Sequence, residues 1–359
     1  MMFLINGILK CRRKIIRRRL QEFILPALVG FSALWGCASR DKHVESADYS
    51  LISPRTQEKV RDVVATVVGV TAVADYRLEF FQHEQVGGRF VPEAGSPTGY
   101  RLAKVAKPIL ISQKIQKVNG GGIIIYRDER NTVILTCEHI LISPDTLRTY
   151  YRDAGGNETK VLASRGIKKR TTHHVINQIN QMQPVEVLHT DARVDLGLVL
   201  VATSPTLGAP FLHRIAYQNE VKWGDLAFVF GYPREIKQLT IGMISPAPYP
   251  GTFSLDVVGR FGFSGGPVFV VRPGGELELA GIIRGVPVNK LQYVAPPPEV
   301  PPGQPLTAED LNLLTAQEYD QIEYGMVYAV SAERIGKFLK ESLPILEKKG
   351  IFLPSQLLP

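Results

Sequence analysis

Short runs of β-branched and aliphatic residues recur along most of this chain, and turn residues separate them. Few segments show helical periodicity; the clearest begins near Ser331 and repeats apolar residues at Ile335, Phe338 and Leu339. The runs predict strands at 120–125, 132–135, 185–188, 196–201, 226–230, 239–245, 268–271 and 279–283. Many short strands and few helices favour β-barrels over a parallel sheet.

Two intervals break this pattern and are predicted to be insertions, at residues 75–118 and 286–324. The first contains aromatic residues, glycines and prolines without strong periodicity. The second is rich in proline and then acidic. Within it, Thr307 and Asp310 have the spacing of a helix N-cap, which predicts a helix through about residue 322.

Ser264 lies in the sequence Gly-Arg-Phe-Gly-Phe-Ser-Gly-Gly-Pro at 259–267, where glycines can bring backbone N–H groups close to a reacting carbonyl. A serine hydroxyl is a poor nucleophile without a base and an orienting acid. His139 follows the strand pattern at 132–135 and is the candidate base. Asp195 introduces a carboxylate into an apolar strand, where an imidazole N–H would satisfy it. Asp191 is the nearby substitute for the acid.

The order of the histidines excludes another class of hydrolase. Residues 262–266 also fit the G-x-S-x-G pattern of α/β-hydrolases, in which the histidine follows the serine. All seven histidines of this chain precede Ser264. The order His139, Asp195, Ser264 is the one found in the chymotrypsin architecture.

Residues 1–37 have the pattern of a signal segment, with a basic start, a short apolar run and Cys37 at the end. Leu-Trp-Gly-Cys at 34–37 resembles the lipobox of bacterial lipoproteins, which implies lipidation of Cys37. Ordinary secretion and an uncleaved anchor remain open alternatives.

This segment contributes +6 of the formal net charge of +8, so the basicity of the chain does not indicate a nucleic-acid partner. Residues 38–56 are predicted to be a polar tether.

No metal or organic cofactor is predicted. His173 and His174 lack metal-ligand spacing to any cysteine or acidic cluster. Cys137 lies close to His139 in the sequence but is interpreted as a small core residue of a strand rather than a nucleophile.

The chain resembles a trypsin-fold serine protease of the HtrA group. The resemblance rests on residues 120–140, 195–200, 224–233, 239–245, 262–267 and 325–330, which follow one another as the blocks of that family do. It implies a mostly β fold of two six-stranded barrels with a C-terminal helix. The protease domain is expected at 57–345, with an N-terminal barrel at about 57–205, a C-terminal barrel at about 206–345 and a tail at 346–359. A PDZ domain, usual in the group, is not expected.

The resemblance also assigns roles to single residues. Ser264, His139 and Asp195 would form the catalytic triad, and the N–H groups of Gly262 and Ser264 would bind the oxyanion. Val258 would lie at the base of the primary pocket and favour aliphatic side chains. Three residues, Ile283, Arg284 and Gly285, would offer a strand edge to the substrate.

The resulting hypothesis is a serine endopeptidase acting on unfolded or extended protein in the bacterial cell envelope, facing the periplasm and tethered to the membrane. A catalytically silent binding or scaffold protein with the same fold is the alternative, and a narrow esterase is a weaker one. Self-association into a homo-oligomer is left open by the sequence.

Overall fold

A computed structural model describes residues 53–104, 111–152, 158–217, 220–246, 250–296, 300, 305–312 and 314–358. The predicted signal segment, Cys37 and most of the tether lie outside these residues. Within the described part of the chain, no helix combines the length and apolarity needed to cross a membrane.

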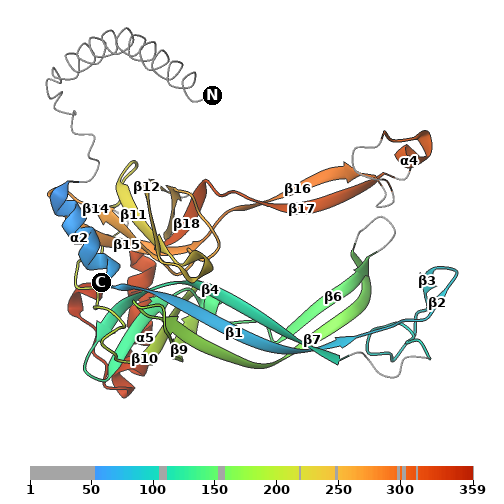
Figure 1. The fold of residues 1–359 in the computed structure, drawn as a ribbon, viewed down its shortest axis with the longest axis horizontal. Helices are drawn as coiled ribbons and strands as arrows, with labels where there is room; N and C mark the ends of the chain where they lie inside the picture. Colours follow the sequence, from blue (N-terminus) through green and yellow to red (C-terminus); the bar gives the residue numbers. More distant parts are fainter. Residues whose placement is uncertain are drawn as a thin grey trace, which may run out of the picture. The chain divides into compact units, whose positions relative to one another are not determined.

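Residues 54–202 form mainly one antiparallel sheet of eight strands (Figure 1). Its order is β6-β7-β1-β4-β5-β10-β9, and β8 pairs with β7. The strands and helices of this half are α2 (Pro54–Val64), β1 (Val67–Phe80), β2 (Gln85–Val86), β3 (Arg89–Phe90), β4 (Ile111–Arg127), β5 (Asn131–Thr136), α3 (Glu138–Leu141), β6 (Thr146–Arg152), β7 (Glu158–Ile176), β8 (Met182–Pro184), β9 (Glu186–Asp191) and β10 (Leu196–Ala202).

Residues 226–331 contain a closed barrel of six strands in the order β11-β12-β13-β18-β15-β14. The elements of this half are β11 (Leu226–Gly231), the 3₁₀ turn η3 (Pro233–Glu235), β12 (Gln238–Pro246), β13 (Thr252–Asp256), β14 (Pro267–Val271), β15 (Leu277–Gly285), β16 (Val288–Ala295), α4 (Ala308–Asn312), β17 (Thr315–Ile322), β18 (Met326–Ser331), α5 (Ala332–Lys348) and η4 (Ser355–Leu357).

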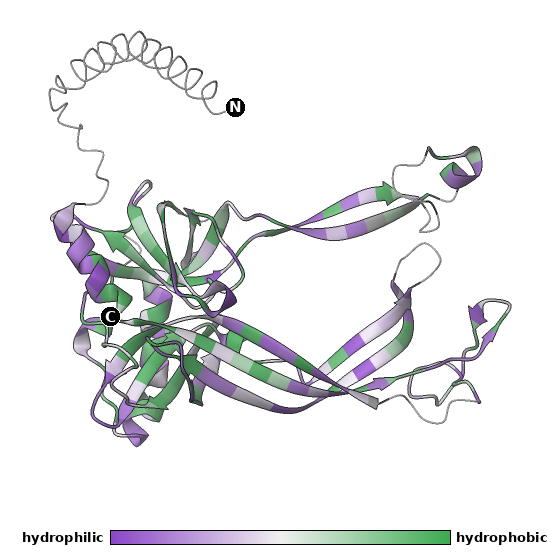
Figure 2. Cartoon of the chain, viewed as in Figure 1, coloured by the Kyte–Doolittle hydropathy of each residue, from purple (hydrophilic) through white to green (hydrophobic). Residues whose placement is uncertain are grey.

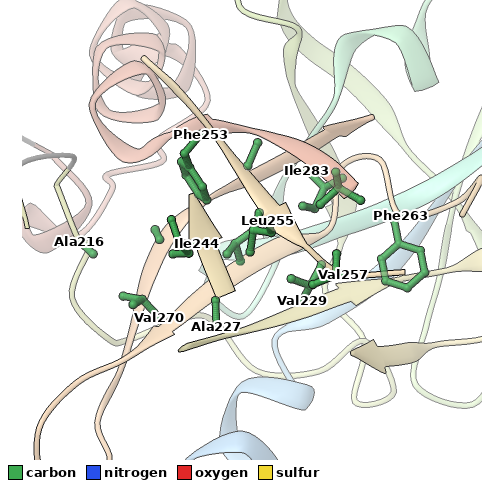
Figure 3. Packing of buried hydrophobic residues seen from close by; sticks show 14 residues of the cluster. Ala216, Ala227, Val229, Ile244, Phe253, Leu255, Val257, Phe263, Val270 and Ile283 are labelled. Atoms are coloured by element: carbon green, nitrogen blue, oxygen red, sulfur yellow. The ribbon is translucent and has the colours of Figure 1, made fainter. Parts of the chain in front are cut away.

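The core of the barrel is formed by apolar side chains that alternate along its strands and meet in the interior. Figure 3 shows this cluster, which includes Val229, Ile244, Phe253 and Leu255, all at most 3% exposed. Hydrophobic residues are correspondingly concentrated in the barrel strands (Figure 2). Burial of this apolar surface is the main stabilising contribution to the barrel.

The predicted fold class is confirmed: the chain is mostly β, with a half-barrel, a closed barrel and a C-terminal helix. Helix α5 starts directly after Ser331 and buries Ile335, Phe338 and Leu339, as its periodicity predicted. The N-terminal half differs in detail, since its sheet has eight strands rather than six. Residues after α5 are also packed, because Ile351 and Leu357 are fully buried.

The helix predicted from Thr307 to about residue 322 is wrong. Among the described residues of this stretch only Ala308–Asn312 is helical, and Thr307 caps this helix by accepting the N–H of Asp310 at 3.2 Å. Residues from Thr315 to Ile322 form β17, which pairs with β16 in a separate two-stranded ribbon (Figure 1). Pairing with β16 overrides the local helical signal, because strand formation depends on a partner distant in sequence.

The first predicted insertion also contains regular structure. Strand β1 continues to Phe80 and β4 begins at Ile111, so these two strands extend together well beyond the glycines at 120–122. Strand β7 pairs with the other edge of β1, and Asp75 and Glu79 of β1 form ion pairs with Arg170 and Arg165 of β7. We call the part of the sheet formed by residues 73–80, 111–118, 146–152 and 158–172 the sheet extension.

Candidate active site

His139 and Asp195 are brought together by the pairing of strands β5 and β10. Strand β5 ends at Thr136, opposite Gly197 of β10, so the residues just beyond them lie close together. His139 lies on the one-turn helix α3 immediately after β5. Asp195 precedes β10 in a left-handed conformation with φ of 57°, which aspartate tolerates better than most residues.

The imidazole of His139 is held by the carboxylate of Asp195 through its Nδ1 atom. Nδ1 lies 3.0 Å from Oδ1 and 2.9 Å from Oδ2, and the backbone N–H of His139 donates to Oδ1 at 3.0 Å. Because a carboxylate only accepts hydrogen bonds, Nδ1 carries the proton and Nε2 is left as the basic nitrogen. The side chain of Asp195 is 8% exposed, whereas that of His139 is 41% exposed.

Asp191, the substitute acid, has a different partner. Arg193 donates to its carboxylate through Nη2 at 2.7 Å and Nε at 3.1 Å. These bonds are the main reason that the pKa of Asp191 falls to about 2. Asp191 and Arg193 line a separate pocket with residues of α5.

Ser264 and His139 line the same pocket, on the two facing halves of the fold. The other residues that line it are Lys117, Val118, Asn119, Arg260, Phe261, Gly262, Phe263, Ile283, Arg284, Gly285, Val286 and Val288. The Ser264 hydroxyl donates to the carbonyl oxygen of Arg284 at 3.3 Å. Rotation about the Cα–Cβ bond of Ser264 would redirect this hydroxyl, and hydrogen bonds of catalytic groups are often loose before substrate binds.

The loop before Ser264 is a tight turn. Phe263 N–H donates to the carbonyl of Arg260 at 3.1 Å, and Gly262 at the third position has φ of 102°. A positive φ at that position defines a type II turn, in which the central peptide is flipped relative to a type I turn. The Gly262 carbonyl accepts the N–H of Tyr232 at 2.8 Å.

Two backbone N–H groups of this loop remain available to the pocket. Among the residues that the structure describes, neither Gly262 N–H nor Ser264 N–H has a protein acceptor. Both residues line the pocket that contains His139. Unpaired donors beside a nucleophile are suited to stabilise an oxygen that becomes negatively charged.

Glycines of β4 allow the N-terminal sheet to approach the loop that contains Ser264. Gly121 N–H donates to the Ser264 carbonyl at 2.7 Å. A Cβ on Gly120 would lie 2.4 Å from that same oxygen, and one on Gly121 would lie 2.8 Å from Gly266 Cα. Residues 120 and 121 therefore help to position Ser264. In the sequence these glycines are recognisable only as the start of the predicted strand 120–125 and of the family block 120–140.

The residues predicted to bind substrate are only partly brought together. Ile283, Arg284 and Gly285 line the pocket beside Ser264. Val258 lies outside that lining and is 55% exposed. Its neighbours Val257 and Gly259 are buried, whereas Val258 itself is exposed to solvent. The apolar residues of the pocket are instead Val118, Phe261, Ile283, Val286 and Val288.

Arg284 makes a contact that sequence reasoning missed. Its Nε atom lies 3.5 Å from Asp195 Oδ2, while its carbonyl accepts the Ser264 hydroxyl. One residue of β15 thus contacts both Asp195 and Ser264. Its place directly after the buried residues of β15 gave no signal of this contact, because the contact depends on how the two halves pack.

Cys137 lies beside His139 and Asp195 but is not activated. Its thiol is fully buried and donates to the Ile283 carbonyl at 3.1 Å. Burial raises its pKa well above the usual value, which disfavours the thiolate needed for attack or for metal binding. Ligand atoms of Cys137, His139 and Asp195 lie within 4.8 Å of one another, but Nδ1 of His139 is already bound to the carboxylate. His173 of β7 donates through Nε2 to the Leu141 carbonyl of α3 at 2.8 Å.

Residues 120–277 match the family model of the trypsin-like peptidase domain. Over these residues the chain is similar to trypsin-like peptidase domains, and the mostly β fold expected from the sequence resemblance is confirmed. Among solved structures, the chain is similar to the HtrA-type protease AlgW with a decapeptide, at 15% identity and a TM-score of 0.42. The match covers 81% of this chain and 67% of that one. No curated protein sequence matches the chain.

Proposed function

We propose that this chain is a serine endopeptidase that hydrolyses peptide bonds of unfolded or extended protein substrates. The observation that carries the proposal is that His139, held by Asp195, lines one pocket with Ser264 and its type II turn. A base with its proton held at Nδ1, a nucleophile and free N–H donors are the components that acyl transfer requires.

In the proposed reaction, Ser264 Oγ attacks the scissile carbonyl carbon while Nε2 of His139 removes the hydroxyl proton. Asp195 stabilises the imidazolium, and the N–H groups of Gly262 and Ser264 bind the oxyanion. The imidazolium then protonates the leaving amine, which leaves an acyl-enzyme on Ser264. A water molecule, deprotonated by His139, attacks the ester, and the acid product departs with Ser264 restored.

A catalytically silent binding protein is the second candidate. It is favoured by the hydrogen bond of Ser264 to the Arg284 carbonyl and by the position of the Arg284 guanidinium next to Asp195. The type II turn argues against this candidate, because it leaves two backbone N–H donors unpaired beside Ser264, which a silent protein does not need.

A fluorophosphonate probe, which labels activated serines, tests the proposal together with digestion of unfolded casein. We expect the wild type to be labelled and to cleave casein, Ser264→Ala to do neither, and Ser112→Ala, a control in the exposed sheet extension, to behave as wild type. Absence of labelling in all three proteins would favour the silent binding protein. Cleavage of activated esters with casein left intact would favour a narrow esterase.

We also propose that the protein is exported to the bacterial cell envelope and tethered through Cys37. The proposal is supported by the basic and apolar pattern of residues 1–37. Metabolic labelling with a palmitate analogue should modify the wild type and not Cys37→Ala. Equal labelling of both proteins would contradict it.

A further inference from the structure

The pocket around Ser264 is positively charged. Three of its lining residues, Lys117, Arg260 and Arg284, are cationic. None of the residues that line this pocket is an aspartate or a glutamate. Asp195 lies behind His139 with only 8% of its side chain exposed, so its charge is directed to the imidazole rather than to the opening. A ligand that enters this pocket meets an excess of cations.

The three cations differ in how far they are neutralised. Lys117 is paired with Glu235. The side chain of Arg284 is half exposed, and its Nε atom lies 3.5 Å from Asp195 Oδ2. The other N–H groups of the guanidinium are therefore left to bind a ligand. Arg260 is exposed, and among the residues that the structure describes its side chain has no acidic partner. Arg260 therefore contributes the largest uncompensated charge.

The position of Arg260 relative to the reacting groups is fixed by its backbone. Arg260 is the first residue of the type II turn that contains Gly262, and its carbonyl accepts the Phe263 N–H. The preceding residue, Gly259, is held by a 2.7 Å bond from its N–H to the Tyr324 carbonyl. The guanidinium is thus attached within a few residues of the oxyanion donors, and Arg284 approaches Ser264 from β15.

We propose that this pocket selects peptides with an acidic side chain within two residues of the scissile bond, through Arg260 and Arg284. The inference rests on the proposed function and names its substrate class. A carboxylate can accept two parallel hydrogen bonds from a guanidinium, a geometry that a neutral side chain cannot match. A lysine at the same place meets like charge, so the pocket also rejects basic peptides. Val286, Val288 and Phe261 provide apolar contacts for the neighbouring side chain.

The kinetic test uses quenched fluorescent peptides in which the four positions around the cleaved bond carry glutamate, alanine or lysine in turn. We expect kcat/KM for the best glutamate peptide to exceed that of its lysine counterpart by about tenfold, since each partly exposed ion pair contributes a few-fold. Raising the salt concentration to about 0.5 M should reduce this ratio, because the Debye length shortens to a few ångströms.

Three variants identify the residues responsible. Arg260→Gln and Arg284→Gln should each reduce the ratio, and Arg260→Glu should shift the preference toward lysine. Arg148→Gln, on exposed β6 of the sheet extension, is the matched control and should keep the wild-type ratio. Thermal unfolding of each variant shows that it is folded. Equal cleavage of glutamate, alanine and lysine peptides by the wild type, with Ser264 labelled, would overturn the inference and leave the proposed function intact.

A binding measurement tests the preference for acidic peptides separately from catalysis, which covers the case in which the wild type cleaves no peptide. Fluorescence anisotropy with fluorescein-labelled glutamate and lysine peptides is recorded on Ser264→Ala, which cannot turn them over. Tighter binding of the glutamate peptide, lost in Ser264→Ala/Arg260→Glu, supports the inference even if the wild type cleaves nothing. Equal binding of both peptides would contradict it.

Discussion

The closed barrel and the β16–β17 ribbon are both antiparallel β structures, yet their side chains lie in opposite environments. In β14, four of five residues are buried, whereas seven of the eight residues of β16 are exposed. The ribbon is held by its backbone pairing, a Lys290–Glu318 ion pair and the Tyr293–Tyr319 ring contact. A two-stranded ribbon alone is only marginally stable in water.

The difference shows that the packed barrel, and not the ribbon, supports the residues of the pocket. Ser264 and the type II turn precede β14, and Arg284 lies on β15, so the nucleophile loop is attached to two neighbouring strands of the packed barrel. The ribbon begins at Val288, directly beyond the pocket. Catalytic geometry requires well-packed support, while a surface segment next to the pocket does not. Substitutions in the two regions should therefore differ in kind and in size.

The largest expected effect on kcat concerns Asp195, the proposed acid, which belongs to the N-terminal half rather than to the barrel. Asp195→Asn should lower kcat for casein-derived peptides by about 10⁴-fold, because an asparagine can hold the wrong tautomer of His139. Asp191→Asn is the matched control and should change kcat by less than about twofold, since Asp191 is bound to Arg193. Near-normal turnover of Asp195→Asn would reassign the acid.

The next largest effect on kcat concerns Gly262, in the turn that precedes β14. Gly262→Ala should reduce kcat by about 10²–10³-fold through loss of an oxyanion donor. The φ of 102° is unfavourable for alanine, and its Cβ would lie 2.6 Å from Pro233 Cα, so the turn must rearrange. Gly274→Ala, also at positive φ but without neighbours within 4 Å, controls for backbone strain and should keep full activity. Equal losses in the two variants would reject the oxyanion role.

Stability measurements compare the barrel core with the ribbon directly. Phe253→Ala should lower the free energy of unfolding by about 3–5 kcal/mol, because it opens a cavity in the buried cluster. Tyr319→Ala, at a ribbon position that is 49% exposed, should cost about 1 kcal/mol or less. Urea titration of both variants, followed by fluorescence, gives the two values. Similar losses would show that the ribbon is part of the cooperative core.

The smallest expected effect is local and depends on pH. His83, 8% exposed, is surrounded by Phe90, Tyr100 and Tyr151, and burial lowers its pKa. The unfolded segment then binds a proton near the ordinary value of 6.5 while the folded one does not, so stability is retained above that pH and lost as pH falls below it.

Hydrogen exchange at pH 7.5 and 5.5 measures this effect in residues 81–103. Protection should fall at the lower pH beyond the intrinsic change in exchange rate, and the excess fall should vanish in His83→Gln. The barrel strands provide an internal reference and should show no such excess. An unchanged pH dependence in the variant would remove His83 as the cause.

Much of the fold was predictable because local patterns and long-range structure agree in the barrel. Apolar runs at 226–230 and 268–271 correspond to β11 and β14, and the periodicity after Ser331 corresponds to α5. The order of His139, Asp195 and Ser264 indicated the residues that the structure brings to one pocket region. Each of them lies next to a buried strand whose pairing leaves little freedom in position.

The features that sequence reasoning missed depend on partners remote in the chain. The segment 315–322 forms a strand because β16 pairs with it, and its own composition does not reveal this. Val258 lies beyond the end of β13, outside the pocket lining, and is exposed. The contact of Arg284 with Asp195 joins residues of the two halves, so no local pattern encodes it.

Strand β4 runs without interruption from the sheet extension to the glycines that touch the Ser264 loop. Adding or removing a single residue between Ser112 and Asn119 would move a side chain into the place of Gly120 or Gly121 and reverse which faces the remaining ones occupy. The far end of β4 can vary in length at little cost. The number of residues between Ser112 and Asn119, by contrast, is fixed by the position of the glycines beside Ser264. Natural variants of this chain should therefore change length only outside this interval.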